Sequence, residues 1–250
     1  MIRIENISKT FNDKKILNDI SFNISKGESI AIIGQSGVGK SVLIKHLNGL
    51  LKIDKGNVTI DDNSLKDLSY KRLQDIRKKI AMVFQFGALL DSLTIKENIQ
   101  LALDSISSIN IKETDKKIKE VLKLVDLEGI ENLMPSELSG GMKKRVGIAR
   151  AIALNPQYML YDEPTTGLDP IMTDSINKLI TKFHNEGDVT SIIVTHEMRT
   201  VKDVSNRVVM LYDGKIHFDG PTDEFINSKD LVVKAFLNGD SSYKHNGELS

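Results

Sequence analysis

The stretch Gly34–Ser41, GQSGVGKS, decides how the rest of this sequence is interpreted. It fits the pattern G-x-x-x-x-G-K-[S/T], whose glycines allow the backbone to wrap around a phosphate with its N–H groups pointing inward. The helix that follows directs the positive end of its dipole at the anion. In this pattern Lys40 reaches the β- and γ-phosphates, and Ser41 places its hydroxyl on Mg²⁺. We expect the phosphate cradle to consist of Gly34, Gln35, Ser36, Gly37, Val38, Gly39, Lys40, Ser41 and Val42.

The surroundings of the cradle support this interpretation. Background residue frequencies give a chance match of roughly 1% in a chain of this length. Ser29–Ile33 is almost entirely apolar, as expected of a strand that is buried on both faces. Val42–Leu50 has the pattern of a helix. A plain glycine-rich turn would need neither neighbour, so the order strand, cradle, helix predicts phosphate binding.

A second motif complements the first. Tyr158–Tyr161 is an apolar strand that ends in two carboxylates, Asp162 and Glu163. A phosphate cradle of this kind needs a carboxylate on a neighbouring strand to hold its Mg²⁺, and Asp162 suits that role. Glu163 is then placed to orient and deprotonate an attacking water. The pair is weak evidence alone, but together with Gly34–Ser41 it predicts nucleotide hydrolysis.

The composition excludes several other kinds of protein. The 250 residues contain 34 basic and 34 acidic side chains, a balance that argues against a nucleic-acid partner. There is no cysteine, which excludes disulfide scaffolds, thiolate metal sites and cysteine nucleophiles. The apolar runs last only a few residues, whereas a membrane-spanning helix needs about 20. Any role at a membrane is therefore expected to come through a partner.

The spacing of apolar residues predicts short strands at both ends of the chain. Alternating or continuous apolar residues mark five of them, Met1–Glu5, Ile20–Ser25, Asn57–Ile60, Tyr158–Tyr161 and Ile192–Thr195. Val208–Tyr212 and Lys215–Phe218 flank Asp213-Gly214, a pair that suits the type I′ turn of a hairpin. Strands that alternate with helices predict an α/β fold.

Helices are predicted mainly in the middle of the chain. Thr94 and Glu97 form a T-x-x-E capping box ahead of an apolar run. Within Lys116–Leu127, one helical face carries the apolar side chains of Ile118, Val121, Leu122 and Val125, which we interpret as core packing. Near the end, Thr222 has the features of a helix N-cap. Asp230–Leu237 has the pattern of a short amphipathic helix.

Leu138–Met142, LSGGM, resembles the signature motif of ATP-binding-cassette (ABC) proteins, and it precedes Asp162 with the order and spacing of that family. Two glycines ahead of a basic helix also form a second anion-binding helix start. The resemblance implies a head-to-tail dimer of two copies. Each ATP is then held between the cradle of one copy and the signature of the other, which is formed by Ser139, Gly140 and Gly141.

The other motifs of the family follow in order. Gln85 matches the glutamine that contacts Mg²⁺ and the attacking water, and Asp169 in Gly167-Leu168-Asp169 matches the loop that crosses to the partner copy. His196 matches the switch histidine that contacts the γ-phosphate. Phe11 stands where the family stacks an aromatic ring on adenine, although a lone phenylalanine can equally be core. The resemblance thus implies Glu163, His196 and Gln85 as catalytic residues, Ser41, Gln85 and Asp162 as Mg²⁺ ligands, and ATP as the substrate.

The resemblance covers nearly the whole chain and implies its architecture. The expected fold is a P-loop NTPase of the ABC type, with a RecA-like core, an antiparallel β subdomain and an α-helical subdomain. We expect the ABC ATPase domain to span residues 1–238, with the helical insertion at roughly 87–155, and residues 239–250 to form a polar tail. His46, His184, His217 and His245 lack a motif and are interpreted as structural or solvent-facing.

Details of the motifs resemble one branch of the family, the ATPases of Mla- and Mkl-type lipid transporters. These details are Met142 at the end of the signature and the sequence that follows Gln85. The branch implies integral membrane permease subunits as partners and, in some members, a lipid-binding protein with a mammalian-cell-entry (MCE) domain and a small regulatory subunit. The chain would then work on the cytoplasmic face of the inner membrane as a peripheral subunit that powers phospholipid transport.

Three interpretations remain open at this level. The catalytic motifs fit the ATPase of a small-solute importer as well as that of a lipid transporter. A non-transport ABC protein is less favoured, because the sequence has one cassette and no cysteine. The apolar side chains of Phe86, Ala88, Leu89 and Leu90 either form a groove for a helix of the permease or pack internally. The helix at Asp230–Leu237 either packs on its own subunit or engages a partner.

Overall fold

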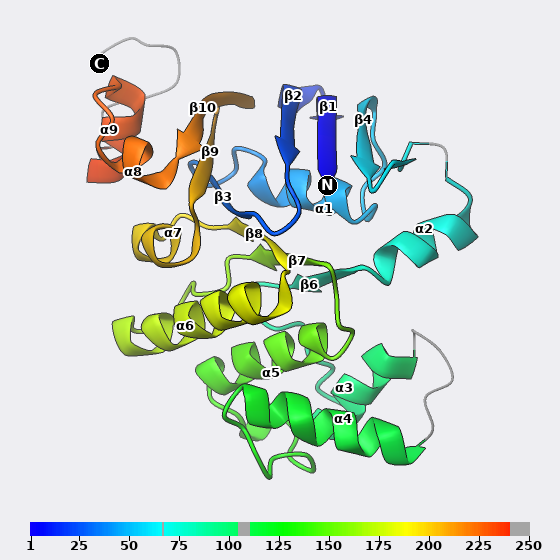
Figure 1. Cartoon of the computed structure of the whole chain (residues 1–250). Coiled ribbons are helices and arrows are strands. Elements are labelled where there is room, and N and C mark those ends of the chain that lie inside the picture. Colours follow the sequence, from blue (N-terminus) through cyan, green and yellow to red (C-terminus); the bar gives the residue numbers. More distant parts are fainter. Residues whose placement is uncertain (67, 105–110, 241–250) are drawn as a thin grey trace.

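Two β-sheets lie above a group of helices in the computed structural model of the chain, which describes residues 1–66, 68–104 and 111–240 (Figure 1). One sheet has four strands in the order β2-β1-β4-β5, and the other has six in the order β10-β9-β3-β8-β7-β6. The strands are β1 (Ile2–Phe11), β2 (Lys14–Ile24), β3 (Ser29–Ile33), β4 (Lys55–Ile60), β5 (Asn63–Ser64), β6 (Ile80–Val83), β7 (Tyr158–Asp162), β8 (Thr190–Val194), β9 (Arg207–Tyr212) and β10 (Lys215–Pro221).

Helices follow most of the strands of the large sheet. The α-helices are α1 (Lys40–Leu47), α2 (Tyr70–Arg77), α3 (Ile95–Asp104), α4 (Ile111–Leu124), α5 (Gly140–Ile152), α6 (Pro170–Gly187), α7 (Met198–Val204), α8 (Thr222–Ile226) and α9 (Leu231–Asn238). Together with the two sheets they confirm the predicted α/β fold with a separate antiparallel sheet. Among the residues described, no helix is long and apolar enough to span a membrane.

The six-stranded sheet is parallel except for its edge strand β10, which runs antiparallel to β9. Every residue of β3, β7 and β8 is buried, as expected of apolar strands covered on both faces. Ile32 of β3 lies beside Val194 of β8, and Asp162 of β7 lies beside the same valine. The carboxyl ends of these three strands therefore meet at one edge of the sheet.

The four-stranded sheet has one buried face and one exposed face. Ile2, Ile4, Ile20 and Ile24 are buried between exposed polar residues, which confirms the predicted alternation. Strands β1 and β2 are both longer than the sequence pattern indicates. The reason is that the pairing of β1 with β2 shifts register after Ile4, so the alternation is interrupted although the strands continue.

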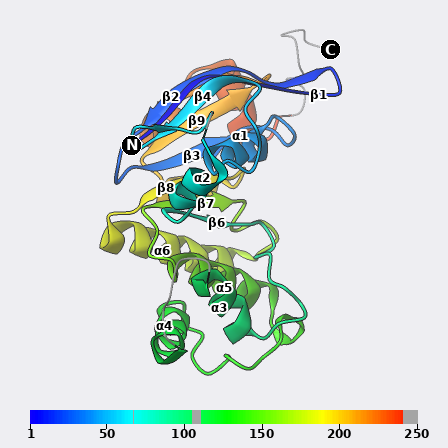
Figure 2. The ribbon, with the colours of Figure 1, turned by 90° about the vertical axis from the view of Figure 1, so that its right-hand side faces the viewer.

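Helix α1 joins the two sheets into one core. Its Leu43, Ile44 and Leu47 are fully buried and belong to the same cluster as Ile4 of the small sheet and Ile30 of the large sheet. Helices α5 and α6 pack against the other face of the large sheet (Figures 1 and 2). The helix that follows Gly34–Gly39 is therefore fixed by apolar contacts on both sides.

Helices α3 and α4 pack against α5 below the large sheet (Figure 1). The predicted capping box is confirmed at the start of α3. The backbone N–H of Thr94 donates to Glu97 Oε2 at 2.7 Å, and the backbone N–H of Glu97 donates to Thr94 Oγ1 at 3.2 Å. The apolar face predicted for α4 is confirmed too, since Ile118, Val121 and Leu122 are buried.

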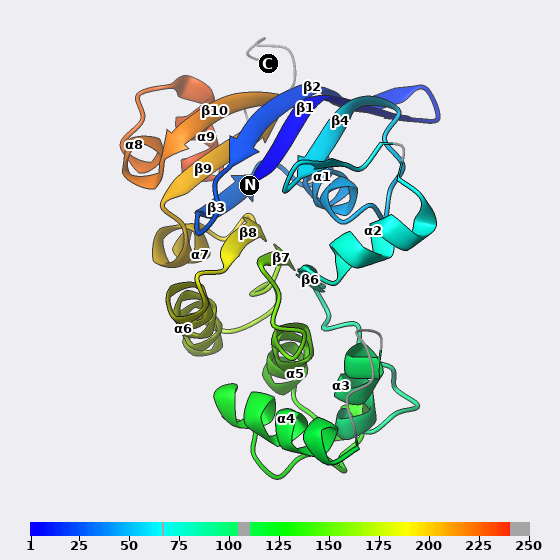
Figure 3. The same ribbon diagram turned by 45° about the vertical axis from the view of Figure 1, so that its right-hand side comes forward.

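The C-terminal part covers one edge of the large sheet, where α8 and α9 lie beside β10 (Figures 1 and 3). The predicted hairpin is confirmed, and Asp213 and Gly214 have the positive φ angles, 49° and 70°, of a type I′ turn. The N-cap prediction for Thr222 was wrong. Pro221 occupies that position, and the Thr222 hydroxyl donates instead to the Ser205 carbonyl at 2.9 Å, because the strand runs directly into the helix.

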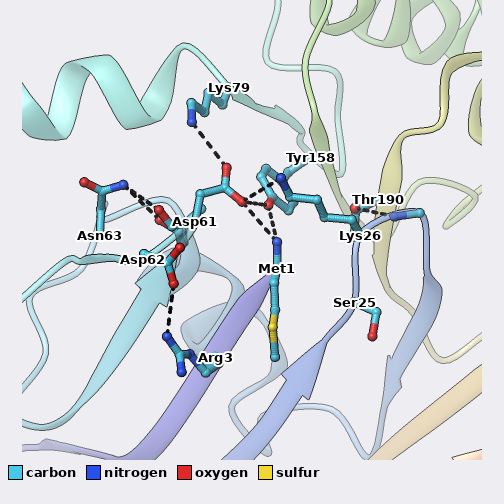
Figure 4. A network of polar contacts seen from close by, with 12 residues as sticks. Met1, Arg3, Ser25, Lys26, Asp61, Asp62, Asn63, Lys79, Tyr158 and Thr190 are labelled. Atoms are coloured by element: carbon cyan, nitrogen blue, oxygen red, sulfur yellow. Dashed lines mark hydrogen bonds and ion pairs between the residues drawn. The ribbon is translucent and has the colours of Figure 1, made fainter.

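A polar junction at Asp61 ties the small sheet to the large one (Figure 4). Its carboxylate accepts from the Tyr158 hydroxyl at 2.6 Å, from the Met1 amino group at 3.1 Å and from Lys79 Nζ at 3.2 Å. Lys26 Nζ lies 3.4 Å away. Burial alone would raise the pKa of Asp61, but these donors outweigh it and hold the pKa well below its usual range.

We expect Asp61→Asn to lower the free energy of unfolding by about 2 kcal/mol at pH 7, because it removes a charged acceptor from several hydrogen bonds. A carboxyl whose folded pKa is depressed stabilises the fold above its unfolded pKa of about 3.9 and loses that contribution as pH falls through the folded value. The difference between variant and wild type should therefore shrink below about pH 4. Urea unfolding at pH 7 and pH 3 measures both effects.

Asp62→Asn is the matched control, because the Asp62 side chain is 94% exposed and pairs with the surface residue Arg3. Its cost should stay within about 0.5 kcal/mol. Equal costs for the two variants would show that the Asp61 junction contributes no more than a surface charge.

Candidate functional site

The Gly34–Ser41 loop connects the buried strand β3 to helix α1. Gly34 has φ 146°, and Gly39, which precedes the first turn of α1, has φ 108°. A Cβ atom at Gly34 would lie 2.4 Å from the Leu211 carbonyl oxygen. The loop needs glycine at that position because neighbouring backbone leaves no room for a side chain.

Lys40 is the first residue of α1, and its side chain folds back over the loop. Its Nζ donates to the carbonyl oxygens of Gly34 at 2.8 Å and Gln35 at 3.1 Å, and only 7% of the residue is exposed. Burial lowers the pKa of Lys40, while the charges of Glu163 and Asp162 oppose that shift. The loop therefore holds an ammonium group at its centre, where a phosphate would sit.

Asp162 stands at the end of β7, next to the loop after β3. Ser41 Oγ donates to Asp162 Oδ1 at 2.8 Å, and Asp162 is 9% exposed. Burial raises the pKa of Asp162, and the hydrogen bond from Ser41 partly opposes this. A hydroxyl and a carboxylate at this distance, both from rigid elements, form an oxygen donor pair of the type that Mg²⁺ prefers.

Glu163 adopts a left-handed backbone conformation with φ 53° immediately after β7. Its N–H donates to the Val194 carbonyl at 2.8 Å, which fixes the turn to the end of β8. Its carboxylate lies 3.0 Å from His196 Nδ1 and accepts from Thr166 Oγ1 at 2.9 Å. A non-glycine residue with positive φ is uncommon and costs free energy, so the surrounding contacts hold this carboxylate in place.

One cavity of about 600 Å³ brings most of the predicted site residues together. Its lining includes the cradle, the catalytic candidates and the predicted adenine contact, namely Gly34, Gln35, Ser36, Gly37, Gly39, Lys40, Ser41, Val42, Gln85, Glu163, His196 and Phe11. Val38 faces a neighbouring hollow instead. The sequence therefore identified residues that are distant along the chain but share one cavity.

The signature residues lie elsewhere. Ser139 caps α5, and its hydroxyl accepts from the Met142 N–H at 3.3 Å. Gly140 lines a second cavity of about 450 Å³, together with Phe86 and Thr166. Of the described residues that line the first cavity, none comes from the Ser139–Gly141 turn or from Asp169.

Asp169 has a clear local role. Its carboxylate accepts from the N–H groups of Ile171 at 2.8 Å and Met172 at 2.9 Å, and so caps α6. The side chain is therefore satisfied within the chain, while the loop before it, at Gly167, is exposed. This places the loop at the surface next to the signature turn.

Two residues near Glu163, Lys144 and Thr166, were not predicted from the sequence as parts of the site. Lys144 on α5 is only 6% exposed, and its Nζ donates to the Thr166 carbonyl at 2.6 Å. Thr166 in turn donates to Glu163. Burial lowers the pKa of Lys144 to about 8, and the charge of Glu163 opposes the shift. A signal was available, because Lys144 falls at helical spacing between the buried Gly141 and Ile148.

Helix α5 also holds the loop that follows Gln85. Arg150 donates to the carbonyl oxygens of Gly87 at 2.7 Å and Ala88 at 2.8 Å. A Cβ at Gly147 would lie only 3.0 Å from Gly87 Cα, so helix and loop are in direct backbone contact. Within the Phe86–Leu90 segment, Leu89 packs internally against the core. Phe86 and Leu90 are instead 78% and 46% exposed.

The remaining histidines have structural contacts where the structure describes them. Their ring nitrogens approach a backbone carbonyl in the case of His46 and His184, and the Asp230 carboxylate in the case of His217. His245 lies outside the described residues.

The comparisons with family models, curated proteins and solved structures agree with one another on the family. Residues 17–166 match the family model described as ABC transporter. The methionine import ATP-binding protein MetN of Clostridium tetani is 41% identical over 94% of this chain and 71% of its own length. The protein TRIGALACTOSYLDIACYLGLYCEROL 3 of Arabidopsis thaliana is 38% identical over 96% of this chain and 74% of its own length. The ATP-binding cassette MJ0796, solved as a post-hydrolysis dimer with ADP and Pi, superimposes with a TM-score of 0.82 at 34% identity, covering 89% of this chain and 99% of that one.

We expect Gly34→Ala to destabilise the fold far more than Gly37→Ala. The first variant adds both left-handed strain and a clash with the Leu211 carbonyl, about 4 kcal/mol together. Gly37 has φ 80°, and in the described part of the chain no heavy atom beyond Gly37 and its two sequence neighbours lies within 4 Å of the position that a Cβ would take there. Its variant should therefore cost only the strain, about 1–2 kcal/mol. Urea unfolding without ligand measures both, and similar costs would contradict the close approach at Gly34.

Proposed function

Because this chain belongs to the ABC transporter family, as an ATP-binding subunit whose ATP hydrolysis is coupled to transport, we propose that two copies clasp ATP between them to power a separate membrane permease that imports a small solute. The observation that carries the hydrolytic part is the single edge of the large sheet where Lys40, Asp162, Glu163 and His196 converge. The nature of the transported solute rests on the relatives.

The residues of the first cavity have distinct roles in this proposal. The N–H groups of the cradle and the Lys40 ammonium bind the β- and γ-phosphates of ATP. Glu163 orients a water and accepts its proton as the water oxygen attacks the γ-phosphorus and the bond to the bridging oxygen of ADP breaks. His196, whose Nδ1 lies 3.0 Å from the Glu163 carboxylate, contacts the γ-phosphate.

Mg²⁺ fits the oxygen donors present. Ser41 Oγ, Asp162 and the Gln85 amide oxygen would hold it, with phosphate oxygens completing the shell. Within the described residues, no group of three or more histidine, cysteine or acidic side chains has an arrangement that could hold a metal ion by itself. When bound, the ion neutralises charge on the β- and γ-phosphates.

A second copy is needed to complete the site. The signature residues Ser139, Gly140 and Gly141 are not among the described residues that line the cavity of their own subunit. Their turn nevertheless offers N–H groups at the start of a helix. The cassette MJ0796 was solved as a dimer with ADP and Pi, which supports a pair of copies. In our proposal the pair is head-to-tail, and this turn faces the γ-phosphate bound to the other copy. The exposed loop at Gly167-Leu168-Asp169 would then cross to the other copy.

This arrangement turns hydrolysis into motion. ATP binds the closed pair more tightly than the open one, because both copies contact the same γ-phosphate. Once that phosphate is lost, the nucleotide no longer favours the closed state. Helix α5 carries the signature turn at one end and, through Gly147 and Arg150, the Phe86–Leu90 loop at the other. Exposed Phe86 and Leu90 are the apolar contacts we assign to the permease.

The relatives favour a small solute over the lipid that the motifs indicate. MetN of Clostridium tetani is named as a methionine importer, and it is 41% identical to this chain. An amino acid is therefore the substrate class that we propose. Phospholipid is the second candidate, because the Arabidopsis relative is named after a glycolipid and the signature ends in Met142.

We expect Glu163→Gln to keep ATP affinity and to lower the rate of ATP hydrolysis by about 10²–10⁴-fold, the usual contribution of a general base. Phosphate release and equilibrium binding of ATP measure the two quantities. Glu186→Gln, at an exposed position near the end of α6, is the control and should hydrolyse ATP at the wild-type rate. Undiminished hydrolysis by Glu163→Gln would remove Glu163 from the role of base.

The substrate class is tested in the cells that make the protein. Mild-detergent purification of the tagged chain should recover an integral membrane permease. Replacement of the wild type by Glu163→Gln should lower uptake of labelled methionine or another amino acid about tenfold or more. Normal amino-acid uptake combined with an altered distribution of phospholipid between membranes would overturn the small-solute proposal and support the lipid one.

A further inference from the structure

The first cavity is lined by both polar and apolar side chains. Lys40, Ser41 and Glu163 are the charged and polar ones beside which phosphates are expected. Phe11, Ile16 and Phe236 supply the large apolar side chains of the same cavity. Phe11 and Ile16 come from the small sheet, whereas Phe236 comes from α9, at the opposite end of the sequence.

One face of Phe11 is already covered. Lys9 Nζ lies 5.2 Å from the centre of the Phe11 ring and is itself held by Asp54 at 2.6 Å. Lys9 is not among the residues that line the cavity. A cation–π contact therefore holds one face of the ring, and Phe11 also lines the cavity.

Helix α9 holds Phe236 firmly at the cavity. Asp230 caps the helix by accepting from the Val233 N–H at 2.9 Å, and it also pairs with His217 of β10 at 2.9 Å. Val233 is fully buried in the cluster that contains Ala31 of β3. Phe236 follows Val233 by three positions, so both lie on the same side of the helix, with Phe236 only partly buried.

We propose that Phe236 is a nucleotide-binding residue, which forms a second aromatic wall for the adenine base beside Phe11. This inference rests on the proposed function, since it assumes that the cavity takes ATP. A flat base bound between two aromatic rings gains dispersion and stacking contacts that the phosphates do not provide. Helix α9 thereby becomes part of the ATP site of its own subunit.

The test separates base contacts from phosphate contacts in the full chain. Calorimetric titration measures the Kd of ATP and of tripolyphosphate, which lacks base and sugar. Phe236→Ala should weaken ATP binding about 5- to 30-fold, the loss expected for one stacked base, and leave the affinity for tripolyphosphate unchanged. Phe236→Tyr should restore ATP affinity because it keeps the ring.

Leu231→Ala is the matched control on the same helix, because Leu231 is 66% exposed and does not line the cavity. It should bind both ligands as the wild type does. If Phe236→Ala fails to fold, Phe236→Leu keeps an apolar side chain without a ring and should show the same selective loss. Unchanged ATP affinity, or an equal loss for ATP and tripolyphosphate, would overturn the proposal.

Lys40→Ala distinguishes this inference from the function on which it rests. It should lose affinity for ATP and for tripolyphosphate together, because it removes the phosphate contact. If Lys40→Ala bound both ligands normally, the cavity would not be a triphosphate site and the proposed function would fail. If only the Phe236 variants behaved as the wild type, the ATP site would stand without α9.

Discussion

The in-register parallel pairing of β3, β8 and β7 is the constraint on which the site depends. Asp162 and Ile32 flank the same residue of β8, so three chain segments end at one level and turn toward the same space. The Glu163 N–H then bonds the end of β8 directly. A slip of one residue in any of these strands would reverse the side chains of that strand and scatter the site. Burial of all three strands on both faces makes such a slip costly.

Helix α5 connects the site at the edge of the sheet to two other regions of the molecule. Its first turn carries Ser139 at the surface, Lys144 in its second turn reaches the Thr166 carbonyl beside Glu163, and Arg150 near its end secures the loop after Gln85. One rigid element thus contacts the neighbourhood of the catalytic carboxylate, the face proposed for the second copy and the loop proposed for the permease. Local shifts at any of these places must involve the other two, because packed helices move as units.

Much of this could be predicted from the sequence, because the decisive signals are local. Glycines at fixed spacing, an apolar strand ending in Asp162-Glu163, and His196 at another strand end each mark a position without knowledge of the fold. What escaped prediction comes from contacts between distant segments. Phe236 lines the cavity through the docking of α9, and Asp61 gathers partners from positions 1, 26, 79 and 158. The transported substrate could not be predicted in detail for a similar reason, since we assign the side chains that bind it to the proposed permease.

The strand order also has a consequence for synthesis on the ribosome. β3 is among the first strands made, yet both of its neighbours, β8 and β9, are translated only near the end. At typical elongation rates of about 5–20 residues per second, Ile30–Ile33 waits for roughly ten seconds or more with both edges unpaired. During that interval the apolar strand needs protection from aggregation. The same pairing that aligns the finished site therefore makes the nascent chain a natural client for chaperones.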